Sequence, residues 1–328
     1  MKPLAIVAEM SCNHLGSLDR AFAIVDAAAN AGATHVKLQC WTAGTMCVSD
    51  YVIPSGPWRG RQMRDLYEQC FTPWAWFRPL FDRISLRGMT PFASAFDLGA
   101  VDFLESIGCP IHKVSSFEIT DLRLIKHMAQ TGKPIVLSTG SATFDEIGSA
   151  FSAACYGAEP DVTILKCTSA YPAPIEDANL VAMKALGAHF PCDYGLSDHT
   201  EGIGVAIAAA ALGATMIEKH LTLWRSDGGP DAGFSMEPAE FARMSAACRS
   251  ARKALGTVKY GDGDRSMKRS VYAIKDIAAG ERFTAENVTT ARPGLGVSAS
   301  DLEWMFEQEC RDWIKAGEPV TWKHLPPF

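Results

Sequence analysis

The fold is decided by eight short apolar runs, each of which ends in or is followed by polar residues. They are LAIVAE (4–9), ATHVKLQ (33–39), MTPFAS (89–94), PIHKVS (110–115), PIVLST (134–139), VTILKC (162–167), CDYGLS (192–197) and TMIEKH (215–220). Short runs of this kind, bounded by Gly, Pro or Asp, predict strands that are buried on both faces. Because helix-like stretches separate them, they predict parallel βαβ units. Eight such units predict an α/β fold, a closed (β/α)8 barrel of the TIM type.

Helical patterns fill the gaps between these runs. Apolar residues at i, i+3 and i+4 predict helices over 18–32, 96–108, 121–132, 143–157, 202–213 and 237–256. The second gap is longer, and we expect residues 49–88 to form an extended loop, with Pro54 and Gly56, followed by an amphipathic helix. Long loops on the upper rim of a barrel commonly cover substrates.

The overall composition is that of an ordinary globular protein. Hydrophobic residues make up 48% of the 328 residues, charged residues 21%, and the formal net charge is −6. The negative charge and the lack of a basic run argue against nucleic acid as a partner, and no apolar run reaches the length of a membrane span. The ten cysteines include no C-x-x-C pair, which favours buried thiols in a reducing compartment and a cytoplasmic location.

A change in composition marks the end of the barrel. Glycine and charged residues become frequent near 256–270, which is typical of a linker. We therefore expect a catalytic barrel over 1–258, a linker over 259–269 and a small second domain over 270–328. Short strands, turns and one helix at 298–313 are expected in that domain.

Two histidines end neighbouring strands. His199 follows the seventh predicted strand and His220 ends the eighth, so the barrel would bring them close together. Imidazole is the commonest side-chain ligand for first-row transition metals. The pair predicts either a metal site with open coordination positions or an acid/base pair.

Lysines and hydroxyls occupy the other strand ends. Lys37 and Lys113 are expected in the barrel mouth, where a buried lysine needs an anion. Five further donors join them to make a ring suited to a small dianion: Gln39, Ser94, Ser116, Ser138 and Ser197. No Walker A or G-x-G-x-x-G motif is present, which argues against ATP and dinucleotides. An aldolase with a Schiff-base lysine at Lys113 or Lys166 is an alternative.

Three carboxylates complete the set of candidate residues. Glu9 and Glu118 lie at or just past strand ends, where each is a candidate general acid or base or a partner for a lysine. Asp231 lies in the loop GGPDAGFSMEP (228–238). It is a candidate for binding sugar hydroxyls or for acting as a base, and the alternative is a turn aspartate.

Several strings together resemble the sialic acid synthase family. They are AEMSCNHLGS (8–17), KLQ (37–39), KVSSFEITD (113–121), LSTGSA (137–142), KCTSAYPAP (166–174), GLSDHTEG (195–202), IEKHLTL (217–223) and GGPDAGFSMEP (228–238). The tail KDIAAGERFTAENV…ARPGLG (275–296) is similar to the small antifreeze-like (SAF) domain of that family. The resemblance covers nearly the whole chain in order.

The resemblance implies specific roles for these residues. His199 and His220 would hold a divalent metal, Mn²⁺ first and Mg²⁺ or Co²⁺ as alternatives. Phosphoenolpyruvate would bind to Lys37, Ser94, Lys113, Ser116, Ser138 and Ser197. The acceptor sugar would contact Gln39, Ser169, Tyr171 and Asp231, with Glu118 near the reacting carbons and Glu9 activating water or steering protons. Arg292 would reach the site of a partner subunit, which implies a homodimer with exchanged tail domains.

The implied activity is a condensation of phosphoenolpyruvate with an acetamido sugar and water, releasing phosphate. LYEQCFTPWAWF (66–77) and SSFEITD (115–121) favour the branch of the family whose acceptor is 2,4-diacetamido-2,4,6-trideoxy-L-altrose. One alternative is another acetamido sugar, giving a neuraminic or legionaminic acid. A second is a sugar-binding barrel without catalytic activity.

Overall fold

The computed structural model describes residues 2–157, 161–261 and 263–327. It divides into two compact units, Met1–Gly256 and Thr257–Phe328. Residue 262 of the expected linker and the terminal residues 1 and 328 lie outside the described residues. No helix in the described part of the chain is both long and apolar enough to cross a membrane.

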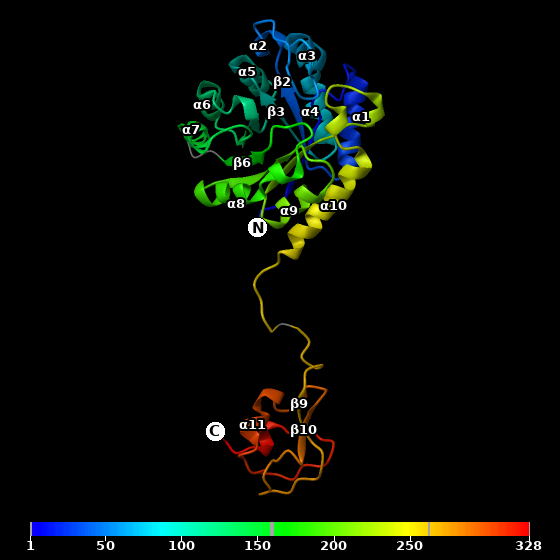
Figure 1. Ribbon diagram of the computed structural model, residues 1–328, viewed down its shortest axis with the longest axis vertical. Helices are drawn as coiled ribbons and strands as arrows, with labels where there is room; N and C mark the ends of the chain where they lie inside the picture. The colour runs from blue at the N-terminus through cyan, green and yellow to red at the C-terminus, as the bar shows by residue number, and fades with distance from the viewer. Residues whose placement is uncertain (1, 158–160, 262, 328) are drawn as a thin grey trace. The chain divides into compact units, whose positions relative to one another are not determined.

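The first unit is a closed barrel of eight parallel strands, which confirms the fold predicted from the apolar runs (Figure 1). Each observed strand lies within two residues of its predicted run. The strands are β1 Ala5–Glu9, β2 His35–Cys40, β3 Thr90–Ala95, β4 His112–Val114, β5 Ile135–Ser138, β6 Val162–Cys167, β7 Asp193–Asp198 and β8 Met216–His220. β1 pairs with β8 and closes the barrel.

Helices surround the barrel, and several of them begin after a side chain that caps the first turn. They are α1 Leu18–Asn30, α2 Ala43–Met46, α3 Met63–Cys70, α4 Phe77–Leu86, α5 Leu98–Ser106, α6 Leu122–Gln130, α7 Phe144–Ala154, α8 Leu180–His189, α9 Gly204–Ala211 and α10 Pro238–Ala254. The side chains of Ser17, Asp97, Asp121 and Thr143 accept the backbone N–H three residues on, which satisfies donors that a helix start leaves free.

The long gap after β2 differs from its prediction. The single amphipathic helix expected in its second part is two helices, α3 and α4, separated by the short 3-10 turn η1 Trp74–Trp76. Pro73 causes the break, because the residue before a proline disfavours helical backbone and proline lacks an N–H. Helix α8 was not predicted.

The second unit packs around its own small core. β9 Ser270–Ala273 and β10 Val288–Ala291 form an antiparallel pair, and the buried side chains include Val271, Phe283 and Ile314. The helix predicted over 298–313 is wrong: only η6 Ala299–Asp301 and α11 Leu302–Met305 form, with η7 Trp322–His324 near the end. Residues Glu309 and Ile314 pair instead with Arg282 and Ile277 in β-bridges, which take Ile314 into the core.

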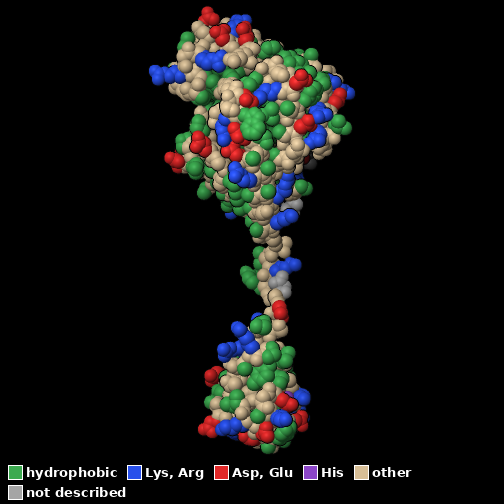
Figure 2. Space-filling view, turned by 90° about the vertical axis from the view of Figure 1, so that its right-hand side faces the viewer, with side chains coloured by type: hydrophobic (Ala, Val, Ile, Leu, Met, Phe, Trp, Pro, Cys, Tyr) green, Lys and Arg blue, Asp and Glu red, His purple; other side chains and the backbone are tan. Residues whose placement is uncertain are grey.

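The surface of the barrel carries both signs of charge. On the face in view in Figure 2, acidic and basic side chains alternate with hydrophobic ones rather than forming a single basic field. This distribution agrees with the formal net charge of −6.

Candidate active site

A cavity of about 830 Å³ opens at the carboxyl ends of the barrel strands. Strand register explains why the polar residues meet there: Glu9 lies opposite both Lys37 and His220, and Ser94 lies opposite both Gln39 and Lys113. Twelve of the residues predicted for the site line the cavity: Lys37, Gln39, Lys113, Ser116, Glu118, Ser138, Ser169, Tyr171, Ser197, His199, His220 and Asp231.

Lys37 is buried and held between two carboxylates. Its Nζ lies 3.0 Å from Glu218 Oε1 and 3.1 Å from Glu9 Oε2, and it donates to Ser94 Oγ at 3.3 Å. Burial lowers the pKa of Lys37, but the charges of Glu218 and Glu9 outweigh that cost and raise its pKa above the ordinary value. Lys37 is therefore a fixed cation.

Lys113 is equally buried but has a different environment. Its Nζ donates to Ser138 Oγ at 2.7 Å and to the Val114 carbonyl at 3.0 Å, and no carboxylate among the described residues forms an ion pair with it. Burial lowers the pKa of Lys113 to about 8, because the charged form has lost water without gaining a paired anion. Lys113 is thus a buried cation whose charge is available to bind an anionic ligand.

The two histidines approach each other as the sequence predicted, with ring centroids 5.4 Å apart. His199 Nδ1 donates to the Thr168 carbonyl at 3.0 Å, so the neutral ring has its lone pair on Nε2. His220 Nδ1 is buried and has no hydrogen-bond partner in the described structure. These free imidazole nitrogens fit a divalent cation.

The protein supplies few ligands for such an ion. Within residues 2–157, 161–261 and 263–327, no group of three or more His, Cys, Asp or Glu side chains is arranged to hold a metal. A cation bound by two histidines would keep most of its coordination positions for water and substrate.

Aromatic and acidic groups flank the histidines. The ring centroids of Tyr171 and His199 lie 4.4 Å apart. Asp231 Oδ2 accepts a hydrogen bond from Ser11 Oγ and lies 4.0 Å from His220 Nδ1. Ser11 therefore fixes the Asp231 carboxylate beside the histidines.

The two candidate acid–base glutamates occupy different positions. Glu118 lines the cavity from η2 Ser116–Glu118, and burial raises its pKa to about 7. Glu9 is fully buried and accepts from Gln39 Nε2 at 2.8 Å and Ser11 N at 3.1 Å. Burial also raises the pKa of Glu9 to about 7, against the opposing charge of Lys37.

Four predicted or considered residues do not line the cavity. Glu9 and Ser94 contact the Lys37 amine but are not among the residues that line the cavity. Lys166 donates to the Cys167 carbonyl and Thr168 Oγ1. Arg292 belongs to the second unit, where it is exposed after β10. Its role stays a prediction.

Sequence reasoning missed the role of Glu218. This residue lines the cavity, pairs with Lys37 and accepts from Ser197 Oγ at 3.1 Å. The charges of Lys37 and Lys113 overcome burial and lower the pKa of Glu218 to about 2. The alternation of side chains along a strand could have predicted this position, because Glu218 is two residues before His220 and so faces the same side of β8.

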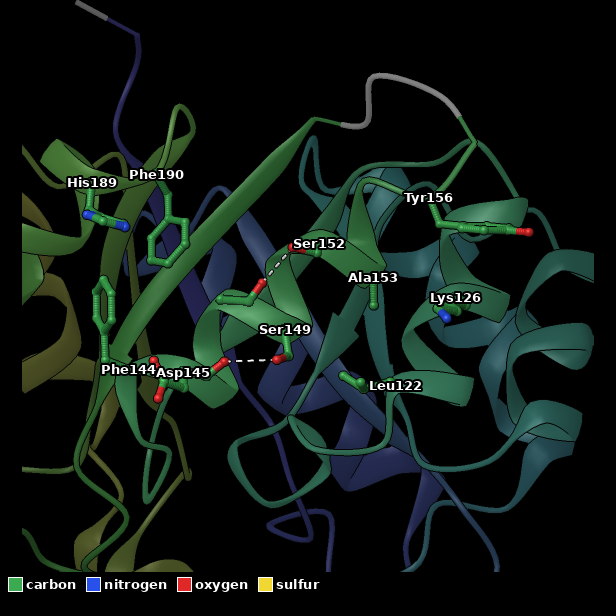
Figure 3. Close-up of a pocket in the computed structure, with 11 residues that line it drawn as sticks. Leu122, Lys126, Phe144, Asp145, Ser149, Ser152, Ala153, Tyr156, His189 and Phe190 are labelled. Carbon is green, nitrogen blue, oxygen red and sulfur yellow. Dashed lines mark hydrogen bonds between the residues drawn. The ribbon is translucent and has the colours of Figure 1, made fainter.

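A second hollow, of about 690 Å³, lies on the outside of the barrel between α6, α7 and the end of α8 (Figure 3). Its lining includes Phe144, Tyr156 and Phe190. The hydroxyls of Ser149 and Ser152 donate to carbonyls of their own helix. The ionisable residues of this hollow, Lys126, Asp145 and His189, form no ion pair with one another in the described structure. The barrel mouth instead brings lysines, carboxylates and histidines into contact, and we assign the chemistry to the mouth.

Comparison with known proteins agrees with this site. The NeuB family matches residues 24–260 and the SAF domain matches residues 268–326. A pseudaminic acid synthase from Helicobacter pylori is 39% identical over 98% of this chain and 97% of that protein. An N,N'-diacetyllegionaminic acid synthase from Campylobacter jejuni is 36% identical over 92% of this chain and 94% of that protein.

A solved structure extends the similarity to three dimensions. The N-acetylneuraminic acid synthetase of Leptospira borgpetersenii, in complex with citrate, superposes with a TM-score of 0.72 at 31% identity and covers 80% of this chain and 88% of its own. The match to the NeuB profile spans more than half of the chain. This chain therefore belongs to the NeuB family, the sialic acid synthases, and carries the SAF domain after its barrel.

Proposed function

We propose that this chain is a pseudaminic acid synthase. It would condense phosphoenolpyruvate with 2,4-diacetamido-2,4,6-trideoxy-L-altrose and water to give pseudaminic acid and phosphate. The observation that carries the proposal is the 39% identity to the Helicobacter pylori enzyme over nearly the whole chain, together with a barrel mouth that contains two buried lysines and a histidine pair.

The phosphate of phosphoenolpyruvate would bind at Lys113. This cation has hydroxyl and carbonyl partners only, so a phosphate would provide the paired anion that its environment lacks. Lys37 would add a second positive charge, and Ser116, Ser138 and Ser197 would donate hydroxyl hydrogen bonds. Two charges and several donors suit a dianion in a partly dry cavity.

The acceptor sugar would bind beside the histidines. Tyr171, Gln39 and Asp231 would contact it, and Ser11 holds the Asp231 carboxylate in place. His199 and His220 would hold a divalent metal, and Mn²⁺ is the metal we expect. When bound, this metal would polarise the sugar aldehyde.

Glu118 is the best candidate to move protons during the reaction. The enol carbon C3 of phosphoenolpyruvate forms a bond to the aldehyde carbon, and water then adds to C2. Cleavage of the C2–O bond releases phosphate. Glu118 lines the cavity while Glu9 does not, and a pKa of about 7 lets Glu118 accept or return a proton near neutral pH. Glu9 would act through Lys37 and Gln39.

We also propose a homodimer in which Arg292 of one subunit completes the site of the other. A guanidinium offers forked donors for the carbonyl and hydroxyl oxygens of an acetamido sugar. The family resemblance of ARPGLG (291–296) motivates this role.

The proposed function is tested by incubating the enzyme with phosphoenolpyruvate, Mn²⁺ and each of three acceptors in parallel. The acceptors are the altrose sugar, its manno stereoisomer and N-acetylmannosamine. We expect phosphate release and a new 2-keto acid chiefly with the altrose sugar. Preferential turnover of the manno isomer would establish the legionaminate alternative, which the Campylobacter jejuni relative favours.

A further inference from the structure

One side of the cavity is apolar. Eight side chains both line the cavity and belong to a separate hydrophobic cluster. The six of them other than Leu66 and Cys70 are here called the apolar wall: Trp41, Met46, Ile53, Trp58, Tyr67 and Phe96. Five of the six come from the long excursion after β2. The rest of the barrel mouth is built mainly from strand ends, which carry the lysines, hydroxyls and histidines.

The apolar wall is held in place by a hairpin over residues 51–63. Ile53 N donates to the Arg61 carbonyl at 3.0 Å, and Gly60 N donates to the Ile53 carbonyl at 2.8 Å. Trp58 Nε1 donates to the Pro230 carbonyl at 3.0 Å. This last bond fastens the hairpin to the loop that carries Asp231.

The wall continues into the acceptor side of the site. The ring centroids of Trp58 and Tyr171 lie 5.5 Å apart, and the Tyr171 ring lies next to the His199 ring. At the other end Tyr67 lines the same cavity as Glu118. A ligand at the reacting centre would therefore contact the wall.

A ligand that fills this cavity needs a charged part and an apolar part. Phosphoenolpyruvate supplies the charge and has almost no apolar surface. The proposed acceptor has two acetamido methyl groups and a C6 methyl where ordinary hexoses have a hydroxyl. Burying a hydroxyl against Met46, Ile53 and Trp58 without a hydrogen-bond partner would cost free energy, whereas a methyl group gains it.

We infer that the apolar wall is a specificity subsite that receives the methyl substituents of the acceptor and selects 6-deoxy sugars over hydroxylated ones. This inference rests on the proposed condensation at the same site. Met46 and Ile53 are only partly buried, so a polar side chain at either position would change the wall without opening the core.

The test compares the wild type with Ile53→Gln and Met46→Gln. Val52→Gln is the matched control, because Val52 is the neighbouring hairpin residue, is 51% exposed and is not among the residues that line the cavity in the described structure. For each protein, kcat/KM is measured with the altrose sugar, its manno stereoisomer and N-acetylmannosamine, and KM is measured for phosphoenolpyruvate.

We expect the wild type to prefer 6-deoxy acceptors by at least about 100-fold, and each wall variant to reduce that ratio about tenfold with KM for phosphoenolpyruvate unchanged. Val52→Gln should keep the wild-type ratio. An unchanged ratio in both wall variants overturns the inference, and so does a wild type that prefers N-acetylmannosamine. A wild type that prefers the manno isomer overturns the proposed function alone. That sugar is also 6-deoxy, so its kcat/KM relative to that of N-acetylmannosamine still tests the wall.

Discussion

The two buried lysines of the site differ in what neutralises them. Lys37 is paired with Glu9 and Glu218, whereas Lys113 contacts only a carbonyl and a hydroxyl. A lysine without a counter-ion loses its proton more readily. Lys113 should therefore give the site a pH dependence that Lys37 does not.

We predict that affinity for phosphoenolpyruvate falls as the pH rises through about 8, the lowered pKa of Lys113. The anion binds the protonated amine, so the Kd should be flat near pH 7 and rise by up to about tenfold per pH unit above the transition. Titration calorimetry from pH 7 to 9.5 measures the Kd for phosphoenolpyruvate. Lys113→Arg should remove the transition, and a flat Kd in the wild type would contradict this account of Lys113.

Glu118 gives a second prediction, this time for stability. Its raised pKa means that the folded protein holds a proton that the unfolded chain has released between about pH 4.5 and 7. Stability from this group is therefore full below the unfolded pKa and is lost as the pH rises to 7. Glu118→Gln should be more stable than the wild type at pH 8, by no more than about 3 kcal/mol, and equal to it near pH 4.5. Urea unfolding at both pH values measures the difference, and a variant less stable at pH 8 would refute it.

The histidine pair predicts metal binding that can be measured without turnover. Mn²⁺ should bind the wild type with loss of its free-ion electron paramagnetic resonance signal, because both imidazoles offer a free nitrogen. His199→Ala and His220→Ala should each weaken binding at least about tenfold. His127→Ala is the control, since His127 contacts Asp102 away from the site. Equal Mn²⁺ affinity in all four proteins would end the metal proposal.

Twelve of the thirty-two residues that line the cavity were predicted, and most of these twelve follow a recognisable strand, because parallel strands end at one edge of the barrel. The apolar wall and the position of Glu9 were not predicted. Glu9 ends β1 as expected, yet its side chain pairs with Lys37 and does not line the cavity. No pattern in the sequence specifies that contact. Trp58 contacts Pro230, 172 residues away, which local periodicity cannot reveal.

At the level of elements, β7 and β8 are joined by a buried ion pair on the side facing the helices. Lys219 Nζ lies 2.7 Å from Asp198 Oδ2 and donates to the Thr200 carbonyl at 2.6 Å. Asp198 Oδ1 accepts from Thr200 N and Oγ1. These bonds fix the turn 198–200 that presents His199.

We predict that Lys219→Met destabilises the protein by about 3–5 kcal/mol, because it leaves the Asp198 carboxylate buried without a partner. The double variant Asp198→Asn/Lys219→Met should recover part of the loss, since it removes both charges. The free energy of unfolding in urea at pH 7 measures both. A loss below about 1 kcal/mol in Lys219→Met would mean that the pair adds little to the turn.

Element prediction succeeded where the apolar pattern was short and repeated. It failed where backbone chemistry or tertiary pairing prevailed. Pro73 breaks the helix predicted in the long gap. In the second unit, Glu309 pairs with Arg282 in a β-bridge and Cys310 N donates to the Glu281 carbonyl, so the buried Cys310 lies in extended chain and not on a helix face. Helical spacing alone does not distinguish these cases.

At the scale of the whole molecule, the central question is whether the SAF unit serves a neighbouring barrel. The two units have separate hydrophobic cores. The sequence indicated both units through the glycine-rich change in composition near 256–270. Residue patterns cannot specify whether Arg292 takes part in a site, because that depends on how subunits assemble.

We predict that two inactive variants complement each other. Arg292→Ala and His220→Ala homodimers should be inactive alone, and a heterodimer should contain one site with an intact barrel and an intact partner arginine. Equal mixing with free exchange should restore about a quarter of wild-type activity. Native mass spectrometry confirms the exchange. Heterodimers without activity would exclude a site shared between subunits.

The most direct test of the proposed reaction uses phosphoenolpyruvate labelled with ¹⁸O in the bridging C2–O–P position. After incubation with Mn²⁺ and the altrose acceptor, mass spectrometry measures the label in phosphate and in the sugar product. We predict that all of the label appears in phosphate and that an unlabelled nine-carbon 2-keto acid forms, because water supplies the C2 oxygen. Label in the keto acid, or no condensed product with any of the three acceptors, would contradict the account.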